Sequence, residues 1–341
     1  MVRPDRRPTT VADVARHAGV SPGTVSKALN GGGQLKTETR QRVIRAAEEL
    51  GFSPNALARS LISGRTYTVG ILTTDSIGRF TIPLITGAED ALGAGQMAMF
   101  LCESRGDAIR EQHYLRMLLA RRVDGLIITG KSSNIRPSLG HDFPIPVVYA
   151  LCQSESADDF SILHDDEQGA EMAIDHLLET GRRRIAHVSG PLSHLASQHR
   201  ARGASTALAR AHESMVGGGT MHGEWSEAWG REAALRLVRN GDPFDGVFCA
   251  SDEIARGMTD GLRDSGVAVP STVGVVGVDN WLVMAETSRP PLTTIDLNLS
   301  ELGRRAATWL LTAIDGGELT AGIERIPATL VKRRSTEMEI S

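Results

Sequence analysis

The spacing of apolar residues near the N-terminus predicts a short helix. Four of these residues follow the i, i+3, i+4, i+7 spacing of a helix that buries one face: Val11, Val14, Ala15 and Ala18. Thr9 or Thr10 is expected to cap this helix, because a threonine hydroxyl can accept a hydrogen bond from a free N–H group of the first turn. Gly19 is expected to end the helix.

Two further helices are expected before residue 53. Ser21 is expected to cap the second one, with Pro22 in the first helical position, where its missing N–H group costs nothing. Its inward residues are Val25, Ala28 and Leu29, and its outward polar residues are Thr24, Ser26 and Lys27. Thr37 is expected to cap the third helix and Gly51 to close it. The apolar face of this helix is predicted to be Val43, Ile44, Ala47 and Leu50. Two short helices joined by a tight turn and backed by a third form a helix-turn-helix arrangement, although other three-helix bundles are common.

From Tyr67 onward the pattern changes to short apolar runs that alternate with longer amphipathic segments. The predicted strands span residues 67–74, 97–102, 124–130, 145–151, 160–165, 183–190, 245–251, 273–279 and 291–297. Helical segments between them include residues 82–95, 110–122, 166–181, 227–241 and 252–266. This alternation predicts parallel sheets covered by helices. No GxGxxG motif follows a predicted strand, so a dinucleotide-binding fold of the dehydrogenase type is unsupported.

Composition indicates a soluble protein that stays inside the cell. The 341 residues are 41% hydrophobic and 23% charged, as in globular proteins. The longest apolar runs fall far short of the roughly 20 residues of a membrane span. The N-terminal segment is basic but has no apolar core, so no signal peptide is expected. Three scattered cysteines (Cys102, Cys152 and Cys249) are interpreted as reduced, mostly buried thiols rather than a disulfide framework or a zinc site.

Charge is distributed unevenly along the chain. Residues 1–65 hold 11 Lys and Arg against 5 Asp and Glu, whereas the remainder holds 26 against 36. A basic N-terminal segment on an acidic body is typical of a DNA-binding module attached to a separate sensor, although a basic segment can also serve solubility alone. The charge pattern therefore adds weight to the helix-turn-helix interpretation.

The motifs then point to a known family. The segments "TVADVARHAGVSPGTVSKALN" and "TRQRVIRAAEELGFSPNALARSL" closely resemble the N-terminal domain of the LacI/GalR family of bacterial transcription repressors. The body resembles the same family in "RRVDGLII", "GRRRIAHVSGP", "ASDEIARG", "VGVVGVDN" and "PPLTTIDLN". The resemblance implies an all-α helix-turn-helix head piece, followed by an α/β core of the periplasmic-binding-protein type with two lobes that hold a ligand between them.

The resemblance also assigns roles in DNA binding. Lys27 matches the position on the recognition helix that reads a base edge, and we expect it to contact guanine N7 and O6. Pro22 and Gly23 match two other base-reading positions, yet neither side chain can donate or accept a hydrogen bond. Residues matching phosphate-binding or helix-end positions are Ser21, Thr24, Ser26 and Asn30. Residues 54–65 match a hinge helix that enters the minor groove, with groove-facing Asn55, Ala58 and Leu61, of which Leu61 would be the apolar wedge.

In the body, the resemblance implies a ligand site. Asp279 matches an acceptor of ligand hydroxyls, Arg200 a cleft arginine and Trp225 an aromatic residue that stacks on the ligand. Other candidate contacts are Phe80, His164, His194 and Ser251. Structural roles are the alternatives: a turn or cap for Asp279, a salt bridge between lobes for Arg200 and simple core packing for Trp225. The i, i+5 spacing of His194 and His199 argues against a metal site and favours a polar cleft loop.

These observations predict a domain organisation and a function. Residues 1–53 form the DNA-binding domain, 54–65 the hinge, and 66–341 the effector-binding and dimerisation core. The first lobe is expected to comprise about 66–163 and 292–324, and the second about 164–291 and 325–341. We expect a cytoplasmic, nucleoid-associated repressor that binds double-stranded operator DNA as a homodimer without a tetramerising helix. Its expected effector is a small polar molecule, with a sugar or glycoside favoured and a nucleobase or another small polar metabolite as the alternative.

Two other classes of function are less well supported. A solute-binding protein for a small sugar would share the two lobes, but the helix-turn-helix segment and the lack of a signal peptide argue against it. An enzyme would need a nucleophile with its base or a metal cluster, and no residue spacing supports either. We therefore expect no catalytic residue, no metal and no cofactor.

Overall fold

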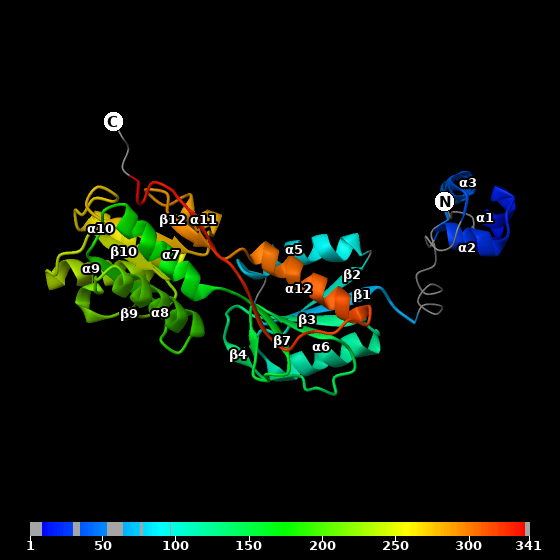
Figure 1. Ribbon diagram of the computed structural model, residues 1–341, viewed down its shortest axis with the longest axis horizontal. Helices are drawn as coiled ribbons and strands as arrows, with labels where there is room; N and C mark the ends of the chain where they lie inside the picture. Colours follow the sequence, from blue (N-terminus) through cyan, green and yellow to red (C-terminus); the bar gives the residue numbers. More distant parts are fainter. Residues whose placement is uncertain (1–8, 30–34, 53–63, 76–77, 96, 338–341) are drawn as a thin grey trace, which may run out of the picture. The chain divides into compact units, whose positions relative to one another are not determined.

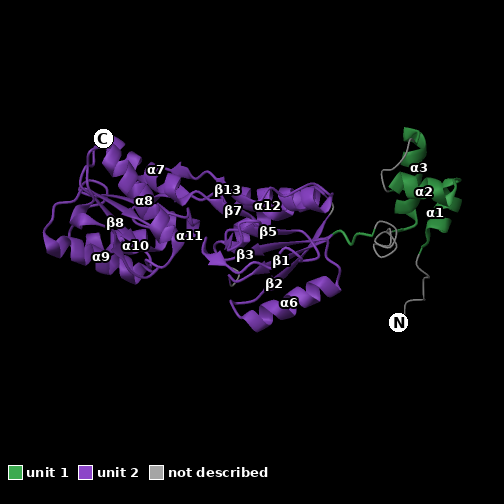
Figure 2. Cartoon of the chain, turned by 60° about the horizontal axis from the view of Figure 1, so that its bottom comes forward, with its two compact units in different colours: residues 1–67 green, residues 68–341 purple. Residues whose placement is uncertain are grey.

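The computed structural model divides into two compact units, residues 1–67 and 68–341 (Figure 2). It describes residues 9–29, 35–52, 64–75, 78–95 and 97–337, and the structural statements below concern these residues. Four predicted DNA-contacting residues lie outside them: Asn30, Asn55, Ala58 and Leu61. The predicted hinge is therefore covered only at residues 64 and 65.

The first unit contains the three helices that the apolar spacing predicts. They are α1 (Val11–Ala18), α2 (Pro22–Leu29) and α3 (Thr37–Glu49) (Figure 1). Thr10 caps α1: its hydroxyl accepts a hydrogen bond from the Asp13 backbone N–H, and the Asp13 carboxylate accepts one from the Thr10 N–H. This reciprocal arrangement is a capping box. Thr9 instead donates to the carbonyl of Leu50 at 3.0 Å, and Gly19 ends α1 with φ of 66°.

A small core joins these helices, and it differs from the prediction at the ends of the apolar faces. The buried residues are Val14, Ala15, Ala18, Val25, Ala28, Val43, Ala46 and Ala47. Val11 and Ile44 are each 39% exposed, so their predicted burial is wrong. Ala46, rather than Ile44, shares the inward face with Val43 and Ala47, because residues three and four apart lie on one side of a helix. Thr37 is the first residue of α3 and not its cap; Lys36 holds that position without a side-chain hydrogen bond.

The first lobe of the second unit is built on a six-stranded parallel sheet in the order β13-β7-β5-β3-β1-β2. Its strands are β1 (Thr68–Thr73), β2 (Ala98–Glu103), β3 (Gly125–Thr129), β5 (Val147–Ala150), β7 (Phe160–His164) and β13 (Gly322–Ile326). Helices α5 (Thr81–Ala94) and α12 (Leu299–Ile314) cover one face, and α6 (Ala108–Ala120) covers the other (Figure 1). A short ladder of β4 (Ile135–Arg136) and β6 (Gln153–Ser154) completes this lobe.

The second lobe repeats this plan with the order β14-β12-β11-β10-β8-β9. Its strands are β8 (Ile185–Ser189), β9 (Met221–His222), β10 (Gly246–Cys249), β11 (Gly274–Val278), β12 (Thr293–Asp296) and β14 (Thr329–Val331). All neighbours are parallel except β12 and β14, which are antiparallel. The helices are α7 (Asp166–Glu179), α8 (Leu195–Arg210), α9 (Glu227–Asn240), α10 (Asp252–Asp264) and α11 (Leu282–Ala285).

Apolar side chains on both faces of the central strands explain why both sheets are covered by helices. In β1, Val69 and Ile71 belong to the cluster packed by α5 and α12, whereas Leu72 belongs to the cluster packed by α6. In parallel sheets that are buried on both faces, the strands have continuous apolar sequences, as these strands do. None of the described helices combines the length and apolarity needed to span a membrane.

The chain passes between the lobes at three places: from β7 to α7, from β12 to α12 and from β13 to β14. The first and third passages lie within about two residues of the predicted boundaries. The second does not, because β12 pairs with β11 and so belongs to the second lobe. The prediction that residues 292–324 lie in the first lobe is therefore wrong at its start, and the chain leaves the second lobe only after Asp296. The position of a strand along the chain does not reveal its pairing.

Candidate DNA-reading surface and ligand cleft

The outward face of α2 carries the polar residues that the sequence singled out. The Ser21 hydroxyl accepts a hydrogen bond from the Thr24 backbone N–H at 3.2 Å and lies 2.9 Å from the Thr24 hydroxyl. Ser21 thus caps α2, as predicted. Pro22, Gly23, Ser26 and Lys27 are exposed, while Val25 and Ala28 hold the helix against the core. The side chain with the longest reach on this face is Lys27, in the last turn of α2.

A cavity of about 430 Å³ lies in the second unit and is lined by residues of both lobes. This volume is in the range of sites for small molecules. Six of the seven predicted ligand-binding residues line it: Phe80, His164, His194, Arg200, Trp225 and Asp279. Phe80 precedes α5 and His164 ends β7 in the first lobe, whereas the other four come from the second lobe. Residues far apart in the sequence thus meet at one cleft.

Arg200 is fixed at this cleft by a buried ion pair. Its Nε donates to Oδ1 of Asp166 at 2.7 Å, and it also donates from a terminal nitrogen to the carbonyl of Ala250. Nε2 of His164 lies 3.1 Å from the same Asp166 oxygen. Burial raises the pKa of Asp166, but the charges and hydrogen bonds of Arg200 and His164 outweigh burial and hold this pKa well below its usual range. Asp166 therefore stays ionised and compensates the charge of Arg200 within one lobe, rather than across the lobes.

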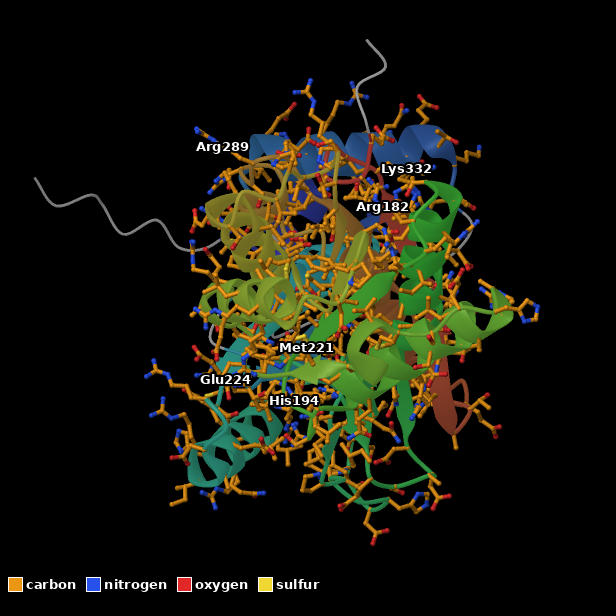
Figure 3. The ribbon with its side chains drawn as sticks, turned by 90° about the vertical axis from the view of Figure 1, so that its left-hand side faces the viewer. Arg182, His194, Met221, Glu224, Arg289 and Lys332 are labelled. Atoms are coloured by element: carbon orange, nitrogen blue, oxygen red, sulfur yellow. The ribbon has the colours of Figure 1, made fainter. Side chains whose placement is uncertain are left out.

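Trp225 forms one wall of the cleft. Its indole N–H donates to Nδ1 of His194 at 2.8 Å, and the two ring centroids are 6.0 Å apart. His194 lies in the same part of the second lobe as Met221 and Glu224, which precede Trp225 in the chain (Figure 3). The indole packs so closely over Gly190 that a Cβ atom there would lie 2.2 Å from it. Trp225 thus presents a ring held in one orientation, which is suited to stacking on a flat apolar face.

Asp279 follows β11 and adopts an unusual backbone conformation. Its φ of 109° lies in a region that residues with a side chain rarely adopt, and its backbone N–H donates to the carbonyl of Ile295 at 2.8 Å. The carboxylate is buried, with a side chain 4% exposed. Its Oδ2 makes no hydrogen bond within the described part of the chain. A buried acceptor without a donor is costly unless a ligand or water supplies one.

Two expectations about this region are not supported by the geometry. Ser251 does not line the cavity; its hydroxyl accepts a hydrogen bond from the Ile254 backbone N–H at 3.2 Å and caps α10. Residues 195–199 form the first turns of α8 rather than a cleft loop. A serine before a helix can serve either role, and the sequence alone does not distinguish them. The described residues contain no group of three His, Cys, Asp or Glu side chains that could hold a metal ion.

Several cleft residues were not predicted from the sequence. They include Asp75, Arg79, Lys131, Glu253 and Trp281. Trp281 lies two residues after Asp279, and its backbone N–H donates to Oδ2 of Asp252 at 2.8 Å. Asp252 also accepts a hydrogen bond from the Thr294 hydroxyl at 2.6 Å, so it holds the segment after β11 against β12. Burial and the neighbouring charge of Asp279 raise the pKa of Asp252. The proximity of Trp281 to a predicted site residue is a signal that could have identified it.

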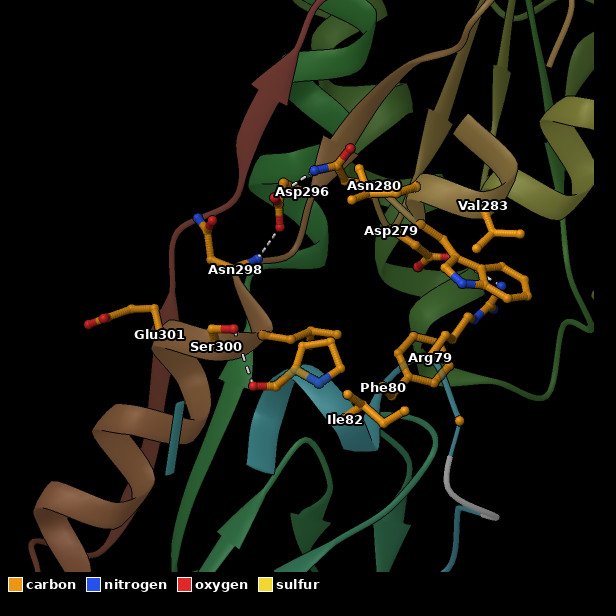
Figure 4. A pocket seen from close by; sticks show the side chains of 15 residues that line it. Arg79, Phe80, Ile82, Asp279, Asn280, Val283, Asp296, Asn298, Ser300 and Glu301 are labelled. Atoms are coloured by element: carbon orange, nitrogen blue, oxygen red, sulfur yellow. Dashed lines mark hydrogen bonds and ion pairs between the residues drawn. The ribbon is translucent and has the colours of Figure 1, made fainter. Parts of the chain in front are cut away.

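A larger cavity of about 790 Å³ adjoins the cleft and shares Arg79, Phe80 and Asp279 with it (Figure 4). Ile82 and Val283 form apolar walls of this cavity. Among its polar residues, Asp296 accepts hydrogen bonds from the backbone N–H of Asn298 and from the side chain of Asn280. The Arg79 and Asp279 side chains therefore lie between two cavities.

The helix-turn-helix unit and the two-lobed cleft together define a DNA-binding regulator with a ligand-binding core. Residues 10–55 match the family model for "Bacterial regulatory proteins, lacI family", and residues 174–336 match the "Periplasmic binding protein-like domain". The chain belongs to the lacI family of bacterial regulatory proteins. It is a DNA-binding transcriptional regulator and not an enzyme, as predicted.

Known relatives resemble the chain over almost its whole length. The HTH-type transcriptional repressor PurR of Aliivibrio salmonicida is 30% identical over 328 residues, which cover 96% of this chain and 98% of the relative. Catabolite control protein A of Priestia megaterium is 30% identical over 335 residues, with coverage of 96% and 99%. Among solved structures, the lac repressor dimer bound to operator and the anti-inducer ONPF has a TM-score of 0.74 at 26% identity, covering 97% of this chain and 99% of that one. The transcriptional regulator CelR in complex with cellobiose has a TM-score of 0.66 at 29% identity, with coverage of 96% and 100%.

Proposed function

We propose that this regulator is a homodimeric repressor whose affinity for a pseudo-palindromic operator is controlled by a small polar effector, and that the effector is a carbohydrate bound in the 430 Å³ cleft. It acts in the cytoplasm, at the nucleoid. Related proteins support the dimer, the operator and the carbohydrate: one solved relative is the lac repressor dimer bound to operator, and another is a regulator in complex with cellobiose. The domains of this function are residues 1–53, 54–65 and 66–341.

On the DNA side, α2 is the proposed recognition helix. Lys27 is exposed and long enough to reach a base edge in the major groove, where an ammonium group can donate to guanine N7 and O6. Pro22 and Gly23 offer no side-chain hydrogen bond, so Lys27 carries most of the direct readout. Proposed phosphate or helix-end contacts are Ser21, Thr24, Ser26 and Asn30, and proposed minor-groove contacts are Asn55, Ala58 and Leu61. Phosphate contacts set the register of the protein on the duplex, and base contacts specify the sequence.

On the effector side, the observation that carries the proposal is the buried Oδ2 of Asp279, which makes no hydrogen bond among the described residues; Asp279 lines a cavity with aromatic walls. A sugar ring offers hydroxyl donors at its edge and apolar C–H groups on its faces. Asp279 can accept from those hydroxyls, while Trp225 and Phe80 can pack against the ring faces. His164, His194 and Arg200 are the proposed polar contacts around the ring. Ser251 is not one of them, because its hydroxyl caps α10.

The proposal is tested with the full-length chain. A random double-stranded DNA library is first enriched for bound sequences, and the affinity for the enriched sequence is then measured with and without each member of a sugar and nucleobase panel. We expect a two-fold symmetric site and a sugar that changes its affinity. An effector weakens operator binding only if it binds the DNA-free conformation more tightly. Enrichment of no common sequence would contradict the repressor proposal, and a response to nucleobases alone would contradict the carbohydrate effector.

A further inference from the structure

Arg79 brings a positive charge from the first lobe to two carboxylates of the second. It lies in the segment between β1 and α5. Its NH1 atom is 3.4 Å from Oδ2 of Asp279 and 3.5 Å from Oε2 of Glu253. The Arg79 side chain is 15% exposed and that of Glu253 is 25% exposed. These partly buried charges attract one another more strongly than surface charges do, because water screens them less. The contact therefore favours the conformation in which the lobes lie close together.

Two aromatic rings hold the Arg79 guanidinium in place. Its central carbon lies 4.5 Å from the centroid of the Phe80 ring and 5.3 Å from the centroid of the Trp281 ring. Both distances are within the range of cation–π attraction. Phe80 comes from the first lobe and Trp281 from the second, so aromatic residues of both lobes contact the guanidinium. An arginine ordered in this way loses less side-chain entropy when it binds a ligand.

Arg79 and Asp279 form an ion pair, but no hydrogen bond connects their side chains. NH1 of Arg79 and Oδ2 of Asp279 are both buried, and neither makes a hydrogen bond within the described residues. A hydroxyl group can accept from the first atom and donate to the second at the same time. One hydroxyl of a ligand, beside this pair and within hydrogen-bonding distance of both atoms, would therefore satisfy both and connect the two lobes.

The charges around this point favour a neutral ligand. Arg200 is compensated by Asp166 at 2.7 Å, so it contributes little net charge to the cleft. Arg79 faces two carboxylates, those of Asp279 and Glu253. The remaining charged residues that line the cavity are Asp75 and Lys131, and they are of opposite sign. An anionic group beside Arg79 would meet two negative charges for one positive charge.

We propose that Arg79 and Asp279 form a clamp that connects the two lobes through one hydroxyl of a neutral ligand, and that Glu253 disfavours an anionic ligand at this point. The ligand part of this inference rests on the proposed function, because it takes the cleft as the effector site. The contact between the lobes does not depend on the identity of the effector. The two parts can therefore be tested separately.

The lobe contact is tested without any ligand. Arg116→Cys on α6 and Arg239→Cys on α9 introduce exposed labelling sites, one in each lobe, while Cys102, Cys152 and Cys249 are buried and not expected to react. Spin labels at these sites report the distance between the lobes in the full-length protein. We expect Arg79→Gln to shift the distance distribution to longer values. An unchanged distribution would overturn the clamp.

A matched control separates this effect from the general loss of an arginine. Arg136 is also 15% exposed and pairs with Glu111 at 2.5 Å, but both residues belong to the first lobe. Arg136→Gln is expected to leave the distance between the lobes unchanged. An equal shift in both variants would overturn the clamp, because it would show a loss of folding rather than of a contact between lobes. Circular dichroism melting of each labelled variant checks that it is folded.

The ligand part is tested by calorimetry with neutral sugars and their own phosphates, such as D-glucose with D-glucose 6-phosphate. We expect a neutral sugar that binds to do so at least tenfold more tightly than its phosphate, with a smaller ratio in Glu253→Gln. Arg79→Gln should weaken binding of the neutral sugar at least tenfold. Tighter binding of the phosphate would overturn the selection against anions. If none of the sugars binds, the carbohydrate effector is contradicted, and the lobe distances alone decide on the clamp.

Discussion

Arg200 and Asp166 are joined by a hydrogen-bonded ion pair whose side chains are only 6% and 1% exposed. Asp166 begins α7 and Arg200 lies in the second turn of α8, so the pair connects two helices beside the cleft. These helices approach closely: a Cβ atom on Gly203 would lie 2.2 Å from the carbonyl oxygen of Glu167. The side chain of Arg200 is thus ordered before any ligand binds.

Removing Asp166 should destabilise the protein strongly. Asp166→Ala leaves the guanidinium of Arg200 buried without its counter-charge, and breaking such a pair typically costs about 3–5 kcal/mol. Urea unfolding at fixed protein concentration measures the change in the free energy of unfolding. The control is Glu167→Ala, since Glu167 pairs with Arg202 at the surface and loss of such a pair costs about 0–1 kcal/mol. If both variants lose a similar, small amount of unfolding free energy, burial does not make the Asp166–Arg200 pair more important than a surface pair.

Glycine at a helix crossing sets the distance between α5 and α12. A Cβ atom on Gly87 would lie 1.8 Å from the backbone oxygen of Ser300, and one on Gly303 would lie 1.9 Å from that of Leu84. Both obstacles are backbone atoms, so a side chain at either position requires the helices to move apart. The same two helices cover one face of the first sheet, and their spacing therefore affects the packing of the whole lobe.

Gly87→Ala is expected to lower the free energy of unfolding by at least about 1–3 kcal/mol, the usual cost of overpacking a core. Gly93 provides the control on the same helix, because a Cβ atom there has no neighbour within 4 Å. Gly93→Ala should instead stabilise the protein by about 0.5–1 kcal/mol, since alanine favours the helix. Thermal and urea unfolding measure both changes. A neutral effect of Gly87→Ala would contradict the close crossing.

His187 should make the protein less stable in mild acid. It is fully buried in β8, its Nδ1 lies 2.9 Å from the carbonyl of Phe248, and its ring stacks on the Phe248 ring at 4.6 Å. Burial lowers the pKa of His187 to about 4, whereas an unfolded histidine titrates near pH ~6.5. Between these values the unfolded chain binds a proton that the folded protein does not. Stability is therefore retained above pH ~6.5 and falls as the pH is lowered towards 4, by about 3 kcal/mol in total.

The test compares the pH dependence of unfolding in two variants. His187→Asn removes the titrating group and retains a donor for the Phe248 carbonyl, so the loss of stability from pH 6.5 to 4 should become smaller. His141→Asn changes an exposed histidine and serves as the control. An identical pH dependence in the wild type and in His187→Asn would show that another group is responsible.

The sequence predicted those parts of the structure that depend on local patterns. All nine predicted strands are present, because each is an apolar run. Most of them are buried, whereas β2, at the edge of its sheet, exposes Phe100 and Leu101. Helix α8 was not singled out, because its buried face includes small residues such as Gly203, Ala204 and Ala207, which give little apolar contrast. Strand β13 alternates exposed and half-buried residues, including Glu324, at the edge of the sheet. Such a strand resembles a loop when only its hydrophobicity is considered.

The cleft residues that could be predicted came from the resemblance to the LacI/GalR family. Asp279, which also follows a predicted strand, and Trp225 could be identified in this way. Arg79 could not be identified, because no local pattern distinguishes it from any surface arginine. Its role depends on the carboxylates of Glu253 and Asp279, which are far away in the sequence and belong to the other lobe. The role of Asp166 as the partner of Arg200 could not be predicted either, because an acidic residue in the first turn of a helix is expected from the helix dipole alone.

Lys27→Ala tests the proposed recognition helix. Loss of a base-reading side chain should weaken binding to the enriched operator by about 1–3 kcal/mol and reduce discrimination at one base pair of each half-site. Lys36→Ala removes the same charge from an exposed position next to α3, so it controls for general phosphate attraction. Fluorescence anisotropy at fixed salt, with operators substituted one base pair at a time, separates the two effects. Equal weakening in both variants, with unchanged discrimination at every base pair, would show that Lys27 contributes charge but does not read the sequence.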